Sequence, residues 1–383
     1  MDHASTTPLD PRVLDAMNPY FTEVYGNASS INAFGLEARE ALEDARTAVA
    51  GLMNAEDKEI VFTGSATEAN NLVLKGFAFR RGKEKAHIAI STIEHDCVLN
   101  SAKWLEKHGF KITYVPVDEY GLLDLGKLEK ALKSGVSLVS VIHANNEIGM
   151  IQPLRDIGEL CHNYGVYFHT DAAQSFGRIP IDVKKMNVDL MTVNAHKIYG
   201  PKGIGALHIR KGIKLEPLLH GGGHEFGLRS GTENVPGIVG FAKAVELRKE
   251  EMGPEAERLS GLRDRLIKGT VEIQESYLNG HPTRRLPNIA NFRFSYIEGE
   301  SLILLLNDEG VAASTGSACS SRSLEPSHVL LALGLKPEEV HGSLRISLGK
   351  YNTEEDIDYI LDVLPRAVEK LRRISPLAKR DRE

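Results

Sequence analysis

Two charged side chains, Asp171 and Lys197, each follow a short apolar run that predicts a β-strand. In an open α/β sheet, the groups that do chemistry gather at the carboxyl ends of strands, so we expect these two side chains to meet there. A lysine that forms a Schiff base and an acid that keeps a ring nitrogen protonated are what pyridoxal phosphate (PLP) chemistry requires. Taken alone, the pair also fits a surface lysine in a turn and an aspartate that caps a helix.

A second segment predicts an anion site. Residues 62–70 pass from a strand through small hydroxyl-bearing residues into a helix, whose first-turn amide groups can bind an anion. Ala66 and Thr67 lie at this helix start, which can therefore hold a phosphate group; an ordinary N-cap is the other interpretation. The glycine-rich residues 221–234 give a weaker signal, because such loops are more often plain turns.

Three further polar residues could contact a substrate. His95 follows a predicted strand, where an imidazole could stack on an aromatic ring and transfer protons, or could be structural. Asn146 stands where a strand gives way to a loop. Arg345 lies in the apolar run 343–348, and a buried arginine needs an anionic partner such as the carboxylate of an amino acid. An edge strand that points Arg345 to solvent is the alternative.

The three cysteines are too few and too scattered for a disulfide framework. Cys319 lies in a run of small residues that predicts an exposed loop, and Arg322 nearby would favour its thiolate, so we expect a nucleophile there. Cys97 and Cys161 fall in helical contexts that are typical of buried, inert thiols. No cysteine or histidine spacing indicates a metal site.

Short β-branched runs alternate with amphipathic segments between residues 59 and 209, the pattern of βαβ units and a mostly parallel sheet. The predicted strands are residues 60–63, 87–90, 111–115, 138–142, 166–169 and 190–193. A long helix follows at 236–268, which Gly253 and Pro254 could break. A second unit has predicted strands at 288–295 and 343–348 and helices at 300–307 and 353–371.

We therefore expect an α/β fold with a large domain around the mostly parallel sheet and a smaller α/β domain. The expected divisions are an N-terminal segment 1–14 that packs on the small domain, a large domain 15–250, and a small C-terminal domain 251–383 that carries the Cys319 loop.

The bulk composition excludes several classes of protein. Among the 383 residues, a hydrophobic share of 42% is ordinary for a globular protein, and a net charge of -6 argues against a general nucleic-acid binder. No apolar run approaches the length that spans a bilayer, and the first residues have no secretory pattern. With free thiols, these features predict a cytoplasmic protein without membrane partners.

Several motifs, taken in order, resemble those of one family. They are the runs 2–8, 67–70, 94–95, 145–149, 171–175, 196–203, 229–232 and 316–319. The chain resembles, over nearly its whole length, the cysteine desulfurases of the class V aminotransferase superfamily that serve iron-sulfur cluster assembly. The resemblance implies the fold of PLP-dependent transferases of fold type I.

The resemblance also implies a role for each site residue. Lys197 would hold PLP covalently, Asp171 would pair with the ring nitrogen, and Gln174 would bond the phenolic oxygen. His95 would stack over the ring and shuttle a proton. The implied cofactor-binding set is Ala66, Thr67, His95, Asn146, Asp171, Gln174, Asn194, His196, Lys197 and Thr232.

Three implied roles concern the substrate and the assembly. Asn146 and Arg345 would hold the substrate L-cysteine, and Cys319 would accept its sulfur. Thr232 would reach the phosphate from a second subunit, which implies a homodimer. Asn194 departs from the pattern, because it stands where relatives commonly have a serine or threonine.

The sequence thus predicts an enzyme, a cysteine desulfurase that gives L-alanine and a persulfide on Cys319, with an iron-sulfur scaffold protein as the sulfur acceptor. Two alternatives stay open. One is a selenocysteine lyase or an aminotransferase of the same superfamily, and the other is a catalytically inactive assembly partner that keeps the fold without the chemistry.

Overall fold

A seven-stranded sheet forms the centre of the protein, whose computed structural model describes residues 1–315 and 326–376. The strand order is β1-β7-β6-β5-β4-β2-β3, and the neighbours from β6 through β5, β4 and β2 to β3 are parallel. β7 runs antiparallel to both β1 and β6. The strands are β1 (Ile60–Thr63), β2 (His87–Ser91), β3 (Lys111–Val115), β4 (Leu138–Ser140), β5 (Tyr167–Asp171), β6 (Leu190–Asn194) and β7 (Gly205–Ile209).

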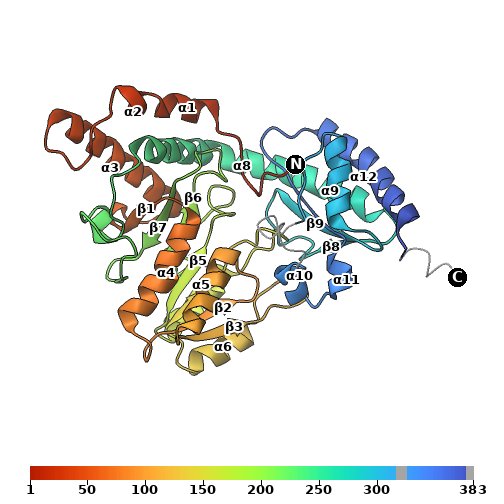
Figure 1. Ribbon diagram of the computed structural model, residues 1–383, viewed down its shortest axis with the longest axis horizontal. Helices are drawn as coiled ribbons and strands as arrows, with labels where there is room; N and C mark the ends of the chain where they lie inside the picture. Colours follow the sequence, from red (N-terminus) through yellow and green to blue (C-terminus); the bar gives the residue numbers. More distant parts are fainter. Residues whose placement is uncertain (316–325, 377–383) are drawn as a thin grey trace.

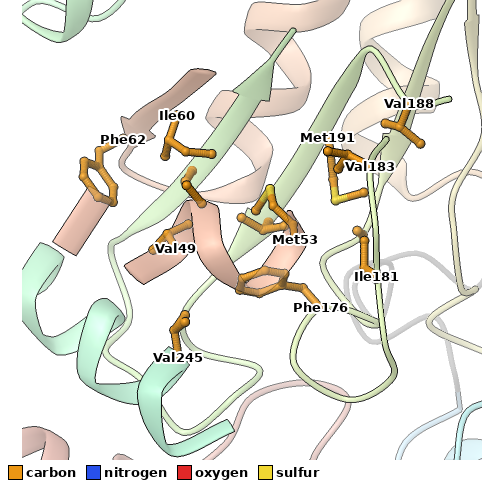
Figure 2. Close-up of a cluster of buried hydrophobic side chains, with 14 of the residues drawn as sticks. Val49, Met53, Ile60, Phe62, Phe176, Ile181, Val183, Val188, Met191 and Val245 are labelled. Atoms are coloured by element: carbon orange, nitrogen blue, oxygen red, sulfur yellow. The ribbon is translucent and has the colours of Figure 1, made fainter. Parts of the chain in front are cut away.

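Helices cover both faces of this sheet, as parallel strands require (Figure 1). Neighbouring residues of one strand therefore enter different apolar clusters: Leu190 of β6 packs toward α4 and α5, whereas Met191 packs toward α3 and α8. Figure 2 shows part of the cluster that contains Met191, with Met53 of α3 and Val245 of α8. The helices of this part are α1 (Pro11–Met17), α2 (Pro19–Thr22), α3 (Ala33–Met53), α4 (Ala66–Arg81), α5 (Asp96–Lys107), α6 (Leu125–Lys133), α7 (Leu154–Asn163) and α8 (Val235–Val271), with short 3₁₀ turns at Asp57–Glu59 and Glu225–Gly227.

A smaller antiparallel sheet, in the order β10-β9-β8, forms the second part of the molecule. Its apolar side packs on α9, α12 and the second half of α8. The elements are β8 (Ser276–Asn279), β9 (Ile289–Phe294), α9 (Gly299–Asp308), α10 (His328–Ala332), α11 (Pro337–Val340), β10 (Ser343–Ser347) and α12 (Glu354–Ile374). The predicted α/β class with a mostly parallel central sheet and a smaller unit is confirmed.

Helix α8 matches the predicted long helix, and the possible break is not present, because the helix continues through Pro254. A proline inside a helix costs about 3 kcal/mol. The packing of the two halves offsets this cost: Val245 lies in the core of the large sheet and Leu259 in the core of the small one. α8 therefore runs from one part of the molecule to the other as one element (Figure 1).

Strand β7 has no counterpart among the predicted strands. It begins with Gly205, a poor strand residue, and it pairs antiparallel in a sheet that reads as parallel. A Cβ atom on Gly205 would lie 2.8 Å from the carbonyl oxygen of Val193 and 2.9 Å from the carbonyl carbon of Ser65. Glycine at this position lets β7 pass directly behind the start of α4, where the predicted anion site lies.

The first residues of the chain contact both parts. The Ala4 N–H donates to the Ser347 hydroxyl of β10 over 2.8 Å, and the Thr7 N–H donates to the His196 carbonyl over 3.0 Å. The domain limits at residues 14 and 250 stay predictions, and α8 crosses the second limit uninterrupted. None of the helices in the described ranges is long and apolar enough to cross a membrane.

Candidate active site

A cavity of about 310 Å³ lies where β5 and β6 end, bordered by the starts of α4 and α5 and by β10. This is the carboxyl edge of the parallel strands, where ligands bind in open α/β sheets. The structure brings ten of the predicted residues to its wall: Ala66, Thr67, His95, Asn146, Asp171, Gln174, Asn194, His196, Lys197 and Arg345.

Asp171 and Lys197 both line this cavity, although they follow different strands. Asp171 is buried at the end of β5, where its Oδ1 accepts the Ala173 N–H over 2.9 Å and its Oδ2 accepts from the side-chain amide of Asn70 over 2.7 Å. The Lys197 amine donates to the carbonyl oxygens of Ala4 and, over 2.6 Å, of Ser5. The N-terminal segment therefore orients the lysine.

The predicted anion site is the start of α4. Ser65 caps the helix, its hydroxyl accepting the Glu68 N–H over 3.1 Å, and Ala66 and Thr67 line the cavity just after it. Glu68 itself points away and forms an ion pair with Arg229 over 3.0 Å. The His196 Nδ1 lies 3.1 Å from the Thr6 hydroxyl, and burial, with the charges of Lys197 and Lys202, lowers the pKa of His196 to about 4.

Arg345 is buried despite its position on an edge strand, with 2% of its surface exposed. Its guanidinium donates to the Asn146 carbonyl over 2.8 Å, to the Ser5 hydroxyl over 2.8 Å and to Asp2 over 2.9 Å. The Nε of Arg345 is also buried and finds no hydrogen-bond acceptor in the described part of the chain. The solvent-facing alternative for Arg345 is therefore wrong, and one of its donors remains for a ligand.

Of the remaining predicted residues, Thr232 does not line the cavity. Thr232 is exposed on the loop that leads into α8. Cys319 lies outside the described residues.

Comparison with known proteins identifies the family. The profile of the class-V aminotransferase family matches residues 1–360. A cysteine desulfurase IscS 1 of Archaeoglobus fulgidus is 53% identical over 99% of both chains, and a cysteine desulfurase IscS of Methanosarcina thermophila is 52% identical over 100% of this chain and 94% of its own. A solved NifS-like protein superposes with a TM-score of 0.91 and 40% identity over 97% of this chain and 99% of its own. The chain belongs to the class-V aminotransferase family, among its cysteine desulfurases.

The cofactor of this family is PLP, and the fold is that of PLP-dependent transferases of type I. The cavity fits such a group. The side-chain oxygens of Gln174 and Asn194 are buried in its wall without a hydrogen-bond partner among the described residues. Buried polar atoms are nearly always paired, so these two require a polar ligand. PLP offers a phenolic hydroxyl that could donate to the Gln174 oxygen, since the Gln174 nitrogen already donates to the Ala4 carbonyl over 2.8 Å. It also offers a phosphate, to which a half-turn of the Asn194 amide would present the nitrogen instead of the oxygen.

The sequence analysis gave no role to several residues of this desulfurase cavity. Cys97, expected to be inert, is half-buried and lines the wall, whereas Cys161 is fully buried and burial raises its pKa to about 12. Glu147 and His328 also line the wall, and the Ser327 hydroxyl donates to Glu147 over 2.6 Å. Burial raises the pKa of Glu147. Their positions depend on contacts between distant segments, which no local motif reveals.

Glu94 lies beside His95 and is fully buried. Burial raises the pKa of Glu94 to about 8, although its Oε1 accepts hydrogen bonds from the Ser91 hydroxyl and, over 2.7 Å, from the Ile142 N–H. The negative charge of Asp171 contributes to this rise. Glu94 is therefore a largely neutral carboxyl group behind the site.

We expect the stability of this protein to depend on pH through Glu94. A carboxyl group whose pKa rises from 4.5 to about 8 on folding adds stability below pH 4.5 and loses that contribution as the pH rises through 8. Glu94→Gln cannot ionise. The melting temperature of Glu94→Gln, relative to that of the wild type, should therefore rise as the pH increases from about 5 to about 9. Glu84→Gln, at an exposed position, is the control. A difference in melting temperature between Glu94→Gln and the wild type that does not change with pH would contradict the assignment.

Proposed function

We propose that this protein is a PLP-dependent cysteine desulfurase that takes sulfur from free L-cysteine, releases L-alanine and holds the sulfur as a persulfide on Cys319. The observation that carries the proposal is the single cavity in which Lys197, Asp171 and Arg345 converge. An amine, an acid and a carboxylate-binding guanidinium are the protein groups that PLP chemistry on an amino acid needs. An aminotransferase shares these three groups, and the Cys319 thiol distinguishes the two reactions.

Four residues would carry the reaction, each through a specific atom or group. When bound, PLP withdraws electrons from the Cα of an amino acid. Asp171, fixed by Asn70 and Ala173, is placed to keep a proton on the ring nitrogen. The Lys197 amine is the base that removes the Cα proton, and the imidazole of His95 exchanges a proton with the substrate. The Cys319 thiolate attacks the substrate sulfur, so that an S–S bond forms as the C–S bond breaks.

The unpaired Nε of Arg345 supports a carboxylate site. The guanidinium contacts Asp2 and Ser5 through one terminal nitrogen, Arg345 lines the cavity, and its Nε–H has no acceptor among the described residues. A two-point contact with the carboxylate of L-cysteine would pair Nε and position the substrate. Asn146, whose carbonyl accepts from the same guanidinium, would complete this contact.

The loop 219–232 supports a homodimer. Leu219 and Phe226 are 44% and 57% exposed, and Thr232 lies exposed on the same loop. Large apolar side chains that gather at a surface indicate an interface. A second copy that covers this loop would bring Thr232 to the phosphate end of the neighbouring cavity.

We further propose that the persulfide passes to an iron-sulfur scaffold protein in the cytoplasm. The IscS names of the relatives support this acceptor.

Cys319→Ser should bind PLP and L-cysteine but form neither alanine nor persulfide, because a hydroxyl does not attack the substrate sulfur. Mass analysis of the intact chain and alanine assays check this expectation. Cys161→Ala is the control, since that thiol is buried outside the cavity. Lys197→Ala, unlike Cys319→Ser, should lose the yellow absorbance of the bound cofactor. Undiminished turnover of Cys319→Ser with a keto acid as product would instead indicate an aminotransferase.

Arg345→Lys should raise KM for L-cysteine about 10-fold, with a smaller effect on kcat, because a lysine keeps the charge but loses the two-point contact. Steady-state kinetics measure the two constants. The control is Arg293→Lys on the neighbouring strand, where the arginine bonds Asn279. A fall in kcat at constant KM would argue against substrate binding by Arg345.

Leu219→Asp with Phe226→Asp should convert a dimer of the 42.1 kDa chain into monomers and weaken PLP retention. Light scattering gives the mass, and absorbance after dialysis gives the retained cofactor. Leu304→Asp, which changes an exposed leucine of α9, should leave both values unchanged. A wild-type monomer that retains PLP would contradict the shared site.

A further inference from the structure

The thiol of Cys97 is part of a hydrogen-bonded chain along the cavity wall. Its Sγ lies 3.0 Å from Nδ1 of His95 and 3.1 Å from Nδ2 of Asn70. Asn70 is completely buried, and its Nδ2 lies 2.7 Å from Oδ2 of Asp171. The chain Asp171–Asn70–Cys97–His95 thus joins the acid of the site to its imidazole.

The donors in this chain can be assigned from the Asp171 end. A carboxylate only accepts, so the atom of Asn70 that faces it must be the amide nitrogen. The Oδ1 of Asn70 has no hydrogen-bond partner within the described ranges, so no contact favours the reversed amide, which would face one oxygen with another. The same nitrogen donates its second hydrogen to Cys97.

The sulfur of Cys97 therefore accepts from Asn70, and its own proton is left for the remaining neighbour, Nδ1 of His95. The backbone N–H of Cys97 donates to the same Nδ1 over 3.2 Å, because His95 is the N-cap of α5. A ring nitrogen that accepts two donors carries no proton. A neutral His95 then carries its proton on Nε2.

We propose that Asn70 and Cys97 are positioning residues, which connect Asp171 to His95 and hold the imidazole in its Nε2–H tautomer. The proposal rests on the proposed desulfurase function, which assigns proton transfer to His95. Neither residue needs to touch the substrate. The amide of Asn70 does not ionise, so it holds the chain in one geometry. The thiol of Cys97 donates the last hydrogen bond of the chain, to Nδ1 of His95.

The test compares Cys97→Ala, which removes the thiol, with Cys97→Ser, which keeps a donor of similar size. Protein loaded with PLP and labelled with ¹⁵N-histidine reports the tautomer of each ring through its nitrogen shifts, and His95→Asn assigns the His95 signals. We expect the Nε2–H tautomer in the wild type and in Cys97→Ser. In Cys97→Ala only the 3.2 Å bond from the backbone N–H of residue 97 still favours this tautomer, so we expect an added population with the proton on Nδ1. Cys161→Ala should leave these signals unchanged.

Turnover gives the second readout. Loss of one hydrogen bond to His95 should lower kcat for alanine release by about 3- to 10-fold in Cys97→Ala, with KM nearly constant, and Cys97→Ser should restore most of the rate. A merely structural role for the thiol would not predict rescue by serine together with a tautomer change.

The tautomer readout requires no turnover, so this inference and the desulfurase function can fail separately. A wild type that produces no alanine but shows the thiol-dependent tautomer would refute the function and keep the inference. A proton on Nδ1 of His95 in the wild type would overturn the inference, and so would identical spectra and rates for the wild type and Cys97→Ala.

Discussion

The hydrogen bonds of residues 2–7 hold the two walls of the cavity together. Ala4 donates its N–H to Ser347 of the small sheet, while its carbonyl oxygen accepts from Lys197 and Gln174 of the large part. Asp2 pairs with Arg345 at the same place. Residues 2–7 therefore set the distance between the Lys197 amine and the Arg345 guanidinium. Both walls keep their geometry because one short segment satisfies buried groups on each side.

The surroundings of Asp171 limit where charge can reside. The His143 N–H donates to the Asp171 carbonyl over 2.9 Å, and His169 lies two residues before Asp171 on β5. Both histidines are buried, and burial lowers their pKa values to about 4 and about 3. Each ring bonds a serine hydroxyl, Ser175 and Ser140 respectively, so the neutral rings are satisfied. With Glu94 largely neutral as well, these three buried groups near Asp171 carry little charge.

Residues that follow strands could be predicted from sequence, because strand ends in a parallel sheet share one edge. Asp171 and Lys197 were placed at the cavity for this reason. Residues whose place depends on contacts between distant segments could not be predicted in this way. Ser5 reaches the site because residues 2–7 contact both parts of the molecule. Cys97 lines the site only because the start of α5 faces Asn70 of α4. The antiparallel β7 was missed because its first residue, Gly205, obscures the strand pattern, and Pro254 left open whether the predicted long helix α8 is continuous.

Helix α8 has a mechanical consequence. One continuous rod is embedded in both apolar cores, so a hinge between the two parts would have to bend it and strain its backbone hydrogen bonds. The two halves of the enzyme are therefore coupled rigidly, and large clamshell motions around the ligand are resisted. Reactants must enter and leave by rearrangement of local segments at the rim, within a frame whose dimensions stay nearly constant during the catalytic cycle.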